Sequence, residues 1–163
     1  MSSTLWAPWR MAYIDRPRTT GCLLCDLARD DDDRTNLILC RGPRAYVLMN
    51  RFPYNNGHLM IVPYWHCAEL DQVSADDSLE IMQEVQRATR ILRQAVGAEG
   101  FNVGLNLGKA AGAGIAEHLH MHVVPRWVGD TNFMPVLADT RVMPDYLEAT
   151  YAKLVPFFRT EKG

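Results

Sequence analysis

The chain has 163 residues, of which 48% are hydrophobic and 22% are charged, and its formal net charge is −2. This size and composition fit one soluble globular domain with a sizeable core, and the small net charge excludes a general electrostatic grip on nucleic acid or on an acidic membrane. No apolar run reaches the ~18–20 residues of a membrane span, and the start lacks the features of a secretory signal, so we expect a cytoplasmic protein.

The first twenty residues are rich in Trp, Pro and Arg, and we expect them to form an extended arm. Trp6 and Trp9 are costly to leave in water, which predicts that the arm packs on the body of the protein or on a partner. No repeat or linker divides the rest of the chain. Residues 1–163 are therefore predicted to form a single domain.

A CxxC pair, Cys22 and Cys25, follows the arm. In a reducing compartment such a pair indicates a metal or redox site rather than a structural disulfide. A thioredoxin-like site would require the pair to open a helix after a strand, and no such alternation surrounds it, which favours zinc. Two thiolates supply half of a tetrahedral zinc site. Cys40 and Cys67 are expected to be buried free thiols.

Three short runs rich in strand-forming residues come next, at residues 36–40, 45–49 and 58–62. The turn-forming RGPR between the first two predicts a hairpin, and Pro63 ends the third. Two more strands are predicted at residues 101–107 and 118–124.

One long helix is predicted between the third and fourth strands. Ser74 is suited to be its N-cap and Gly97 lies where a C-terminal glycine belongs. A second helix is expected at about residues 145–155. Apolar residues recur along the long helix at steps that predict one buried face: Leu79, Met82, Val85, Leu92 and Val96. The element order indicates an α+β fold with an antiparallel sheet and helices on one side.

The stretch EHLHMHVVPRW, residues 117–127, contains three of the five histidines. Side chains alternate across a strand, so His118, His120 and His122 are predicted to share one face. The apolar residues between and after them are predicted to point into the core: Leu119, Met121 and Val123.

Three interpretations of this row are open: a polar sheet face, a metal site of three imidazoles, or a nucleophilic histidine between two others that bind and orient charge. The small-residue loop GKAAGAG, residues 108–114, precedes the row, and its backbone N–H groups can approach a phosphate closely. A phosphate loop beside a row of imidazoles favours the third interpretation.

HLHMHVV, residues 118–124, resembles the H-φ-H-φ-H-φ-φ pattern (φ apolar) of the histidine triad (HIT) family of nucleotide hydrolases and transferases. MNRFPYNNGHLMIVPYWH at 49–66 and NLGKAAGAGIAEHLHMHVVPRW at 106–127 resemble two further segments of that family, so the resemblance covers most of the chain. It implies a HIT-like fold, with an antiparallel sheet of about five strands, one long helix and a C-terminal helix.

The resemblance also implies roles for the histidines. His120 would attack the α-phosphate of a nucleotide and form a nucleotidyl-histidine intermediate, which divides one difficult displacement into two easier ones. His122 would contact phosphate oxygens, and His118 would orient its neighbour. His58 matches a position beside the active site and is given a supporting hydrogen bond.

Several further positions match substrate contacts of the family. Asn50 would hydrogen-bond the ribose, Asn106 would contact phosphate or ribose, and Leu48 and Met60 would lie near the base pocket. Ordinary core packing is an alternative for the two apolar residues.

The segment AGAGIAEH departs from the AGQxVxH of many relatives, because it lacks the glutamine that binds phosphate. Backbone amides around Gly112, Ala113 and Gly114 are therefore expected to bind more of the phosphate. The ending GIAEHLHMHVVPRWVGDTNFM and the arm resemble the diadenosine tetraphosphate phosphorylase branch, in which inorganic phosphate removes the nucleotide from the histidine. Trp127 is expected to shape that site. A hydrolase, a nucleoside phosphoramidase and a non-catalytic nucleotide-binding module are the alternatives.

Some relatives bind zinc through a CxxC, a histidine after the third strand and the first histidine of the triad. The resemblance therefore implies that His66 and His118 complete the site begun by Cys22 and Cys25. Such a closed Cys₂His₂ tetrahedron is structural. The resemblance further implies a homodimer and a nucleotide substrate, and we expect no organic cofactor, nucleic-acid partner or membrane partner.

Overall fold

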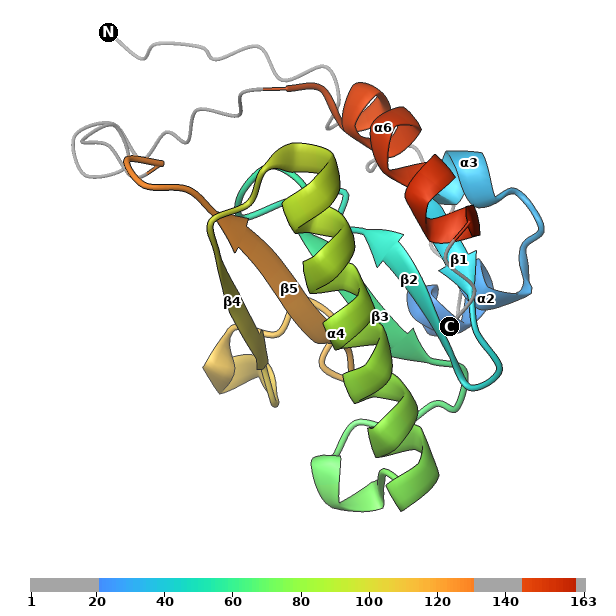
Figure 1. Cartoon of the computed structure of the whole chain (residues 1–163). Helices are drawn as coiled ribbons and strands as arrows, with labels where there is room; N and C mark the ends of the chain where they lie inside the picture. Colours follow the sequence, from blue (N-terminus) through green and yellow to red (C-terminus); the bar gives the residue numbers. More distant parts are fainter. Residues whose placement is uncertain (1–20, 131–144, 161–163) are drawn as a thin grey trace, which may run out of the picture.

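The computed structural model describes residues 21–130 and 145–160 (Figure 1). Five strands form one sheet in the order β1-β2-β3-β5-β4, and every neighbouring pair is antiparallel. The predicted α+β fold is confirmed. In chain order the elements are α2 (Leu23–Arg29), α3 (Asp33–Asn36), β1 (Ile38–Arg41), β2 (Ala45–Met49), β3 (Leu59–Pro63), the 3-10 helix η2 (Leu70–Gln72), α4 (Ala75–Val96), β4 (Gly100–Leu105), the 3-10 helix η3 (Lys109–Ala111), β5 (Met121–Arg126) and α6 (Leu147–Thr160).

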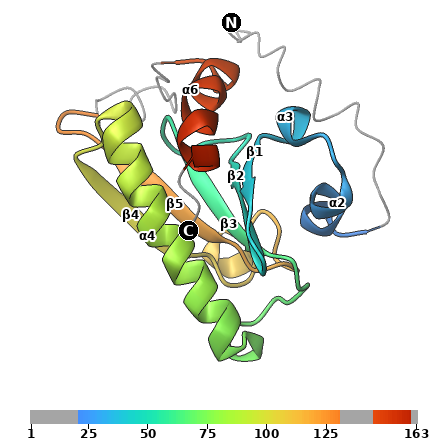
Figure 2. The same cartoon turned by 45° about the vertical axis from the view of Figure 1, so that its right-hand side comes forward.

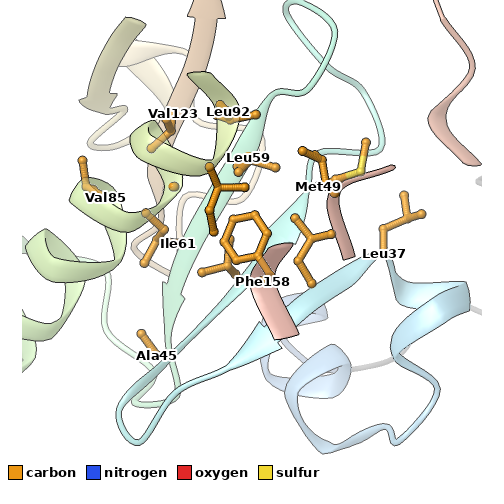
Figure 3. Close-up of a cluster of buried hydrophobic side chains, with 14 of the residues drawn as sticks. Leu37, Ala45, Met49, Leu59, Ile61, Val85, Leu92, Val123 and Phe158 are labelled. Carbon is orange, nitrogen blue, oxygen red and sulfur yellow. The ribbon is translucent and has the colours of Figure 1, made fainter. Parts of the chain in front are cut away.

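The sheet separates two buried clusters of unequal size. The larger lies between the sheet and the helices α4 and α6, and Figure 3 shows Phe158 of α6 among side chains of the strands and of α4. The smaller lies on the other face, where Leu24 of α2 packs on Tyr46 and Leu48. Figure 2 shows α2 and α4 on opposite sides of the strands. The two predicted helices, α4 and α6, therefore lie on one side as expected, and the additional helix α2, which the sequence did not predict, lies on the other.

The long helix α4 begins and ends where the sequence predicts. The Ser74 hydroxyl accepts a hydrogen bond from the Asp77 N–H at 3.1 Å, and Gly97 ends the helix with a left-handed φ of 65°. The N-terminal arm and residues 131–144 lie outside the described residues. No helix in the described part of the chain is long and apolar enough to cross a membrane.

The predicted buried face of α4 is wrong in its first two turns. Leu79 is 59% exposed and Met82 is 47% exposed, whereas Val85 and Leu92 are buried as predicted and Val96 is partly buried. A step of three residues falls about 60° short of a full turn, so Met82 and Leu79, which lie one and two such steps before Val85, are about 60° and 120° away from the buried face. The face that packs on the sheet mixes steps of three and four: Ile81, Val85, Ala88, Leu92 and Ala95.

Strand boundaries differ from the predicted ones by up to three residues. β1 begins at Ile38, because Asn36 ends α3 and donates its amide to Asp30 Oδ2 at 2.9 Å. β5 begins at Met121, so His118 and His120 precede the strand. The predicted alternation still holds: all three histidines are buried on one face, while the intervening Leu119, Met121 and Val123 pack in the larger cluster.

Candidate functional site

Strand register brings predicted site residues into one row across the sheet. Leu48 pairs with Met60, Met60 with His122, and His122 with Gly104. Residues directly opposite one another share a face, so all four lie on the face away from α4. Leu48 and Met60 are buried in the smaller cluster, while nothing lies within 4 Å of the position a Cβ on Gly104 would take. Gly104 thus leaves open space beside His122.

His120 has one ring nitrogen committed to the backbone. Its Nδ1 lies 2.8 Å from the carbonyl oxygen of His118, and a carbonyl can only accept, so Nδ1 carries the proton. In the neutral imidazole Nε2 then holds the lone pair. The His120 ring centroid lies 4.8 Å from that of His122, with the rings nearly perpendicular. This arrangement presents a nucleophilic nitrogen next to a second imidazole.

His58 and His122 form a hydrogen-bonded pair whose tautomers follow from one backbone group. The Tyr54 N–H donates to His58 Nδ1 at 3.0 Å, so the proton of neutral His58 is on Nε2. That Nε2 lies 2.9 Å from His122 Nδ1 and donates to it. The remaining proton of His122 is therefore on Nε2. Nε2 of His122 is therefore a hydrogen-bond donor, whereas Nε2 of His120 is unprotonated, although both residues are imidazoles in one row.

Burial keeps this histidine pair uncharged. It lowers the pKa of His58 to about 3, with further lowering from His122 and His120. Burial also lowers the pKa of His122 to about 4, with a smaller contribution from His120. Both rings are consequently neutral near pH 7, which preserves the hydrogen bond between them.

The two predicted polar contacts, Asn50 and Asn106, both reach this pair. Asn50 Nδ2 lies 3.3 Å from His58 Nδ1, and its Oδ1 accepts from the Phe52 N–H at 2.9 Å. Asn106 Nδ2 lies 3.4 Å from His122 Nε2. The structure therefore brings both amides to the histidines, one from the end of β2 and one from the end of β4.

The small-residue loop is folded on itself. Gly112 N–H donates to Lys109 O at 3.0 Å and Ala113 N–H donates to Gly108 O at 3.3 Å. Gly112 has a φ of 85°, which suits glycine. Two of the amides that we expect to bind phosphate are thus engaged within their own turn, so binding there would require the turn to open. Gly114 follows in the same loop, and Ile115 packs it onto the smaller cluster.

The structure does not bring Trp127 to the histidines. Its indole packs on the larger cluster, on the α4 face of the sheet, and its Nε1–H donates to the Val96 carbonyl at 3.3 Å. Trp127 follows β5 directly and has the same parity as Val123, which also faces α4, so its expected part in shaping the phosphate site stays a prediction.

Tyr54 is a site residue that sequence reasoning missed. Its ring centroid lies 4.7 Å from that of His58 and 5.6 Å from that of His122, and Asn106 Nδ2 lies 3.4 Å from its hydroxyl. It lies in the β2–β3 loop, where no sequence periodicity predicts which way a side chain points. In the sequence, only its position four residues before His58 could have indicated that Tyr54 lies near the site.

A second cluster has the donor set and spacing of a zinc site. Cys22, Cys25, His66 and His118 offer ligand atoms that all lie within 4.8 Å of one another. The Nδ1 of His118 is 3.2 Å from the Cys22 sulfur and 3.4 Å from both the Cys25 sulfur and His66 Nδ1. A tetrahedral zinc with ordinary bond lengths has ligand atoms about 3.3–3.8 Å apart, so the residues present fit this ion.

Surrounding hydrogen bonds orient these ligands. His118 Nε2 donates to the Pro63 carbonyl at 3.0 Å, which leaves the Nδ1 lone pair directed at the cluster. The helix that carries Cys25 is tied to the sheet, because the Tyr46 hydroxyl donates to the Leu24 carbonyl at 2.7 Å and the Arg41 guanidinium donates to the Ala28 carbonyl at 2.6 Å. His118 and the helix that carries Cys25 are therefore held in place by contacts outside the cluster.

The remaining cysteines are free thiols apart from this cluster. Cys67 is buried, and Cys40 is partly buried, with a pKa that burial raises to about 12. Neither is suited to be a nucleophile at neutral pH.

Comparison with known proteins gives a family-model match and similarity to two enzymes. A model of the HIT domain matches residues 33–128. Over 154 residues the chain is 40% identical to an AP-4-A phosphorylase of Mycobacterium tuberculosis, covering 90% of this chain and 79% of that protein. It is 25% identical over 106 residues to an adenosine 5'-monophosphoramidase of Schizosaccharomyces pombe, covering 65% of this chain and 74% of that protein.

A solved structure shares the fold over most of its length. A zinc-bound histidine triad family protein from Mycobacterium smegmatis superposes with a TM-score of 0.69 at 25% identity, covering 86% of this chain and 94% of that one.

Proposed function

The chain belongs to the histidine triad (HIT) family, and from that premise we propose that it transfers nucleotidyl groups from dinucleoside polyphosphates, with phosphorolysis of diadenosine tetraphosphate favoured. Membership makes it a nucleotidyltransferase or hydrolase. The proposed nucleotidyl transfer rests on one observation. His120 Nδ1 donates to the His118 carbonyl, so Nε2 of the neutral imidazole holds the lone pair that would attack phosphorus. The similarity to the mycobacterial phosphorylase over most of both chains supports the choice of substrate.

In the proposed reaction His120 Nε2 attacks the α-phosphorus of diadenosine tetraphosphate. A P–N bond forms as the P–O bond to the bridging oxygen breaks, and ATP leaves as an anion. An oxygen of inorganic phosphate then attacks the same phosphorus, the P–N bond breaks, and ADP is released with His120 restored. Dividing the displacement in this way gives each step an effective leaving group.

Three other histidines support this step without reacting. His122 would donate from Nε2 to a phosphoryl oxygen whose negative charge grows in the transition state. His58 would act through His122, by holding the proton on the nitrogen that faces substrate. His118 would position His120 through its backbone carbonyl.

Substrate contacts are proposed for the row across the sheet and for the amides beside it. Asn50 would hold the ribose, and Asn106 a phosphoryl oxygen near His122. The base would lie close to Leu48 and Met60, with the open space at Gly104 admitting the nucleotide.

Zinc is the proposed structural ion of the Cys₂His₂ cluster. Cys22, Cys25, His66 and His118 would hold it, and it would cross-link the N-terminal segment to the segment before β5 that carries the catalytic histidine. The zinc-bound M. smegmatis relative supports this assignment. Four free cysteines suit a reducing compartment, so we place the enzyme in the cytoplasm.

A homodimer is proposed through the edge strand β4. This strand has β5 as its neighbour on one side and ends the sheet on the other, with Val103 45% exposed. An exposed sheet edge is a template for pairing, and a second copy of β4 would cover it. The mass of the protein in solution tests this assignment.

Product analysis with diadenosine tetraphosphate tests the proposed reaction. We expect ADP and ATP when inorganic phosphate is present, and no steady turnover without it. If AMP and ATP appear without phosphate, water is the acceptor and the protein is a hydrolase that uses the same histidine.

A nucleoside phosphoramidase is the second candidate, favoured by the similarity to the S. pombe phosphoramidase. Turnover of an adenosine phosphoramidate, but not of diadenosine tetraphosphate, would establish it. A non-catalytic binding module is the third possibility. The variant His120→Asn separates it from an enzyme, because an enzyme loses turnover while keeping nucleotide binding, whereas a binding module behaves as before.

A further inference from the structure

Tyr54 contacts the buried histidine pair from the β2–β3 loop. Its ring is tilted against both His58 and His122, and its backbone N–H donates to His58 Nδ1 at 3.0 Å. The residue is 45% exposed, so the ring lies between the buried pair and solvent. Its hydroxyl is therefore at the side of the site from which a substrate must approach.

Three polar groups meet where the hydroxyl lies. Asn106 Nδ2 is 3.4 Å from His122 Nε2 and 3.4 Å from the Tyr54 hydroxyl. In the tautomer that the Tyr54 backbone imposes, His122 Nε2 is a donor, and with the amide oriented as in the structure Asn106 Nδ2 is also a donor. Two donors do not bond to each other, and the Asn106 amide donates instead to the Tyr54 hydroxyl. The hydroxyl oxygen therefore accepts from Asn106, and its own proton is directed toward a further acceptor. An acceptor at the mouth of the site would receive hydrogen bonds from both this hydroxyl and His122 Nε2. An anionic phosphoryl oxygen is such an acceptor.

We propose that Tyr54 is a substrate-contacting residue whose hydroxyl donates a hydrogen bond to a phosphoryl oxygen of the group that reacts at His120. His122 and Asn106 would donate to the same group. This inference rests on the proposed nucleotidyl transfer. The chemistry suits either the α-phosphoryl group of the nucleotide or the incoming inorganic phosphate, and the two steps of the reaction distinguish them.

The variant Tyr54→Phe tests the hydroxyl alone, because it keeps the ring against the histidines and the backbone N–H. Its matched control is Tyr146→Phe, the same chemical change at a residue that is 82% exposed and precedes α6. Both variants are compared with the native protein in formation of nucleotidyl-His120 without phosphate, and in release of the nucleotide at varied phosphate. Thermal unfolding of all three checks the fold.

We expect Tyr54→Phe to slow one of the two steps by roughly tenfold to a hundredfold, the effect of one hydrogen bond to a charged group. Slower formation with unchanged KM for the dinucleotide assigns the contact to the α-phosphoryl group. Raised KM for phosphate assigns it to the acceptor. The control should match the native protein, and so should the unfolding temperatures.

Unchanged rates in both steps would overturn the inference while leaving the proposed function intact. An absence of any nucleotidyl transfer by the native protein would instead overturn the proposed function.

Discussion

At the scale of single residues, three imidazoles on one face differ in chemistry because each has a different backbone partner. The His118 carbonyl holds the proton of His120 on Nδ1. The Tyr54 backbone N–H fixes the tautomer of His58, and His58 in turn holds the proton of His122 on Nε2. The nucleophile and the donor are thus distinguished by hydrogen bonding and not by residue type. Exchange of the two histidines' roles would therefore require new backbone contacts.

The depressed pKa of His58 predicts acid sensitivity of the fold. In the unfolded chain this histidine has an ordinary pKa near 6.5, against about 3 when folded, so between these values the unfolded state binds more protons. Stability is therefore fully present above about pH 6.5 and is lost as pH falls toward 3, by roughly 3 kcal/mol at pH 4.5.

The variant His58→Gln removes this titration. We expect its free energy of unfolding to fall less steeply between pH 7 and 4.5 than that of the native protein, measured by denaturant titration. Acid also protonates the zinc ligands, but both proteins share those. Parallel pH profiles would contradict the assigned burial of an uncharged His58.

At the scale of elements, helix α2 positions two zinc ligands through its ties to the sheet. Arg41 of β1 donates to the Ala28 and Asp30 carbonyls, both at 2.6 Å, at the end of α2. Loss of these bonds would let the helix shift relative to His118. The variant Arg41→Ala should therefore weaken zinc binding by roughly tenfold, as loss of supporting contacts does at metal sites.

Competition with a chromogenic chelator measures this affinity. Arg44→Ala is the matched control, because Arg44 pairs with Asp76 and Asp77 at the start of α4 and its side chain is 48% exposed. Equal zinc affinities for the two variants would show that the hydrogen bonds from Arg41 to α2 do not position the zinc ligands.

Strand β4 gives a prediction about access to the histidines. Because nothing lies within 4 Å of a Cβ on Gly104, Gly104→Val should fold normally and fill the space beside His122. We expect KM for the dinucleotide to rise at least about tenfold, the effect of lost binding contacts. Gly100→Val, at the other end of β4, is the control, and an equal KM for both variants would show that nucleotide does not enter there.

Much of the element pattern could be predicted from the sequence because local chemistry specifies it. Ser74 and Gly97 set the ends of α4, and alternation set the faces of the histidine row. The same alternation would have placed Trp127 on the α4 face had it been continued to that residue. Tyr54 could not be predicted, because loop residues have no periodicity and its direction depends on contacts with distant strands.

At the scale of the whole molecule, the metal cluster and the nucleophile are linked through one residue. His118 offers Nδ1 to the cluster, donates from Nε2 to Pro63, and accepts from His120 through its carbonyl. A bound zinc would thus stabilise the segment that orients His120. The cluster residues came together from three separate parts of the chain, and resemblance, not spacing alone, indicated the full set.

Zinc removal tests this link. After dialysis against a strong chelator we expect a lower unfolding temperature and a lower kcat, both restored by added zinc, because an ion that binds the folded state stabilises it. Cys22→Ser should reproduce the metal-free behaviour. A chelated protein that keeps its native unfolding temperature would contradict a structural zinc.

The covalent intermediate is the central claim, and intact-protein mass spectrometry measures it most directly. The protein is mixed with diadenosine tetraphosphate without phosphate, then digested to locate any modification. We predict one adenylyl group per chain, carried by His120, absent from His120→Asn, and released as ADP when phosphate is added. Turnover without an adduct, together with full activity of His120→Asn, would contradict the account.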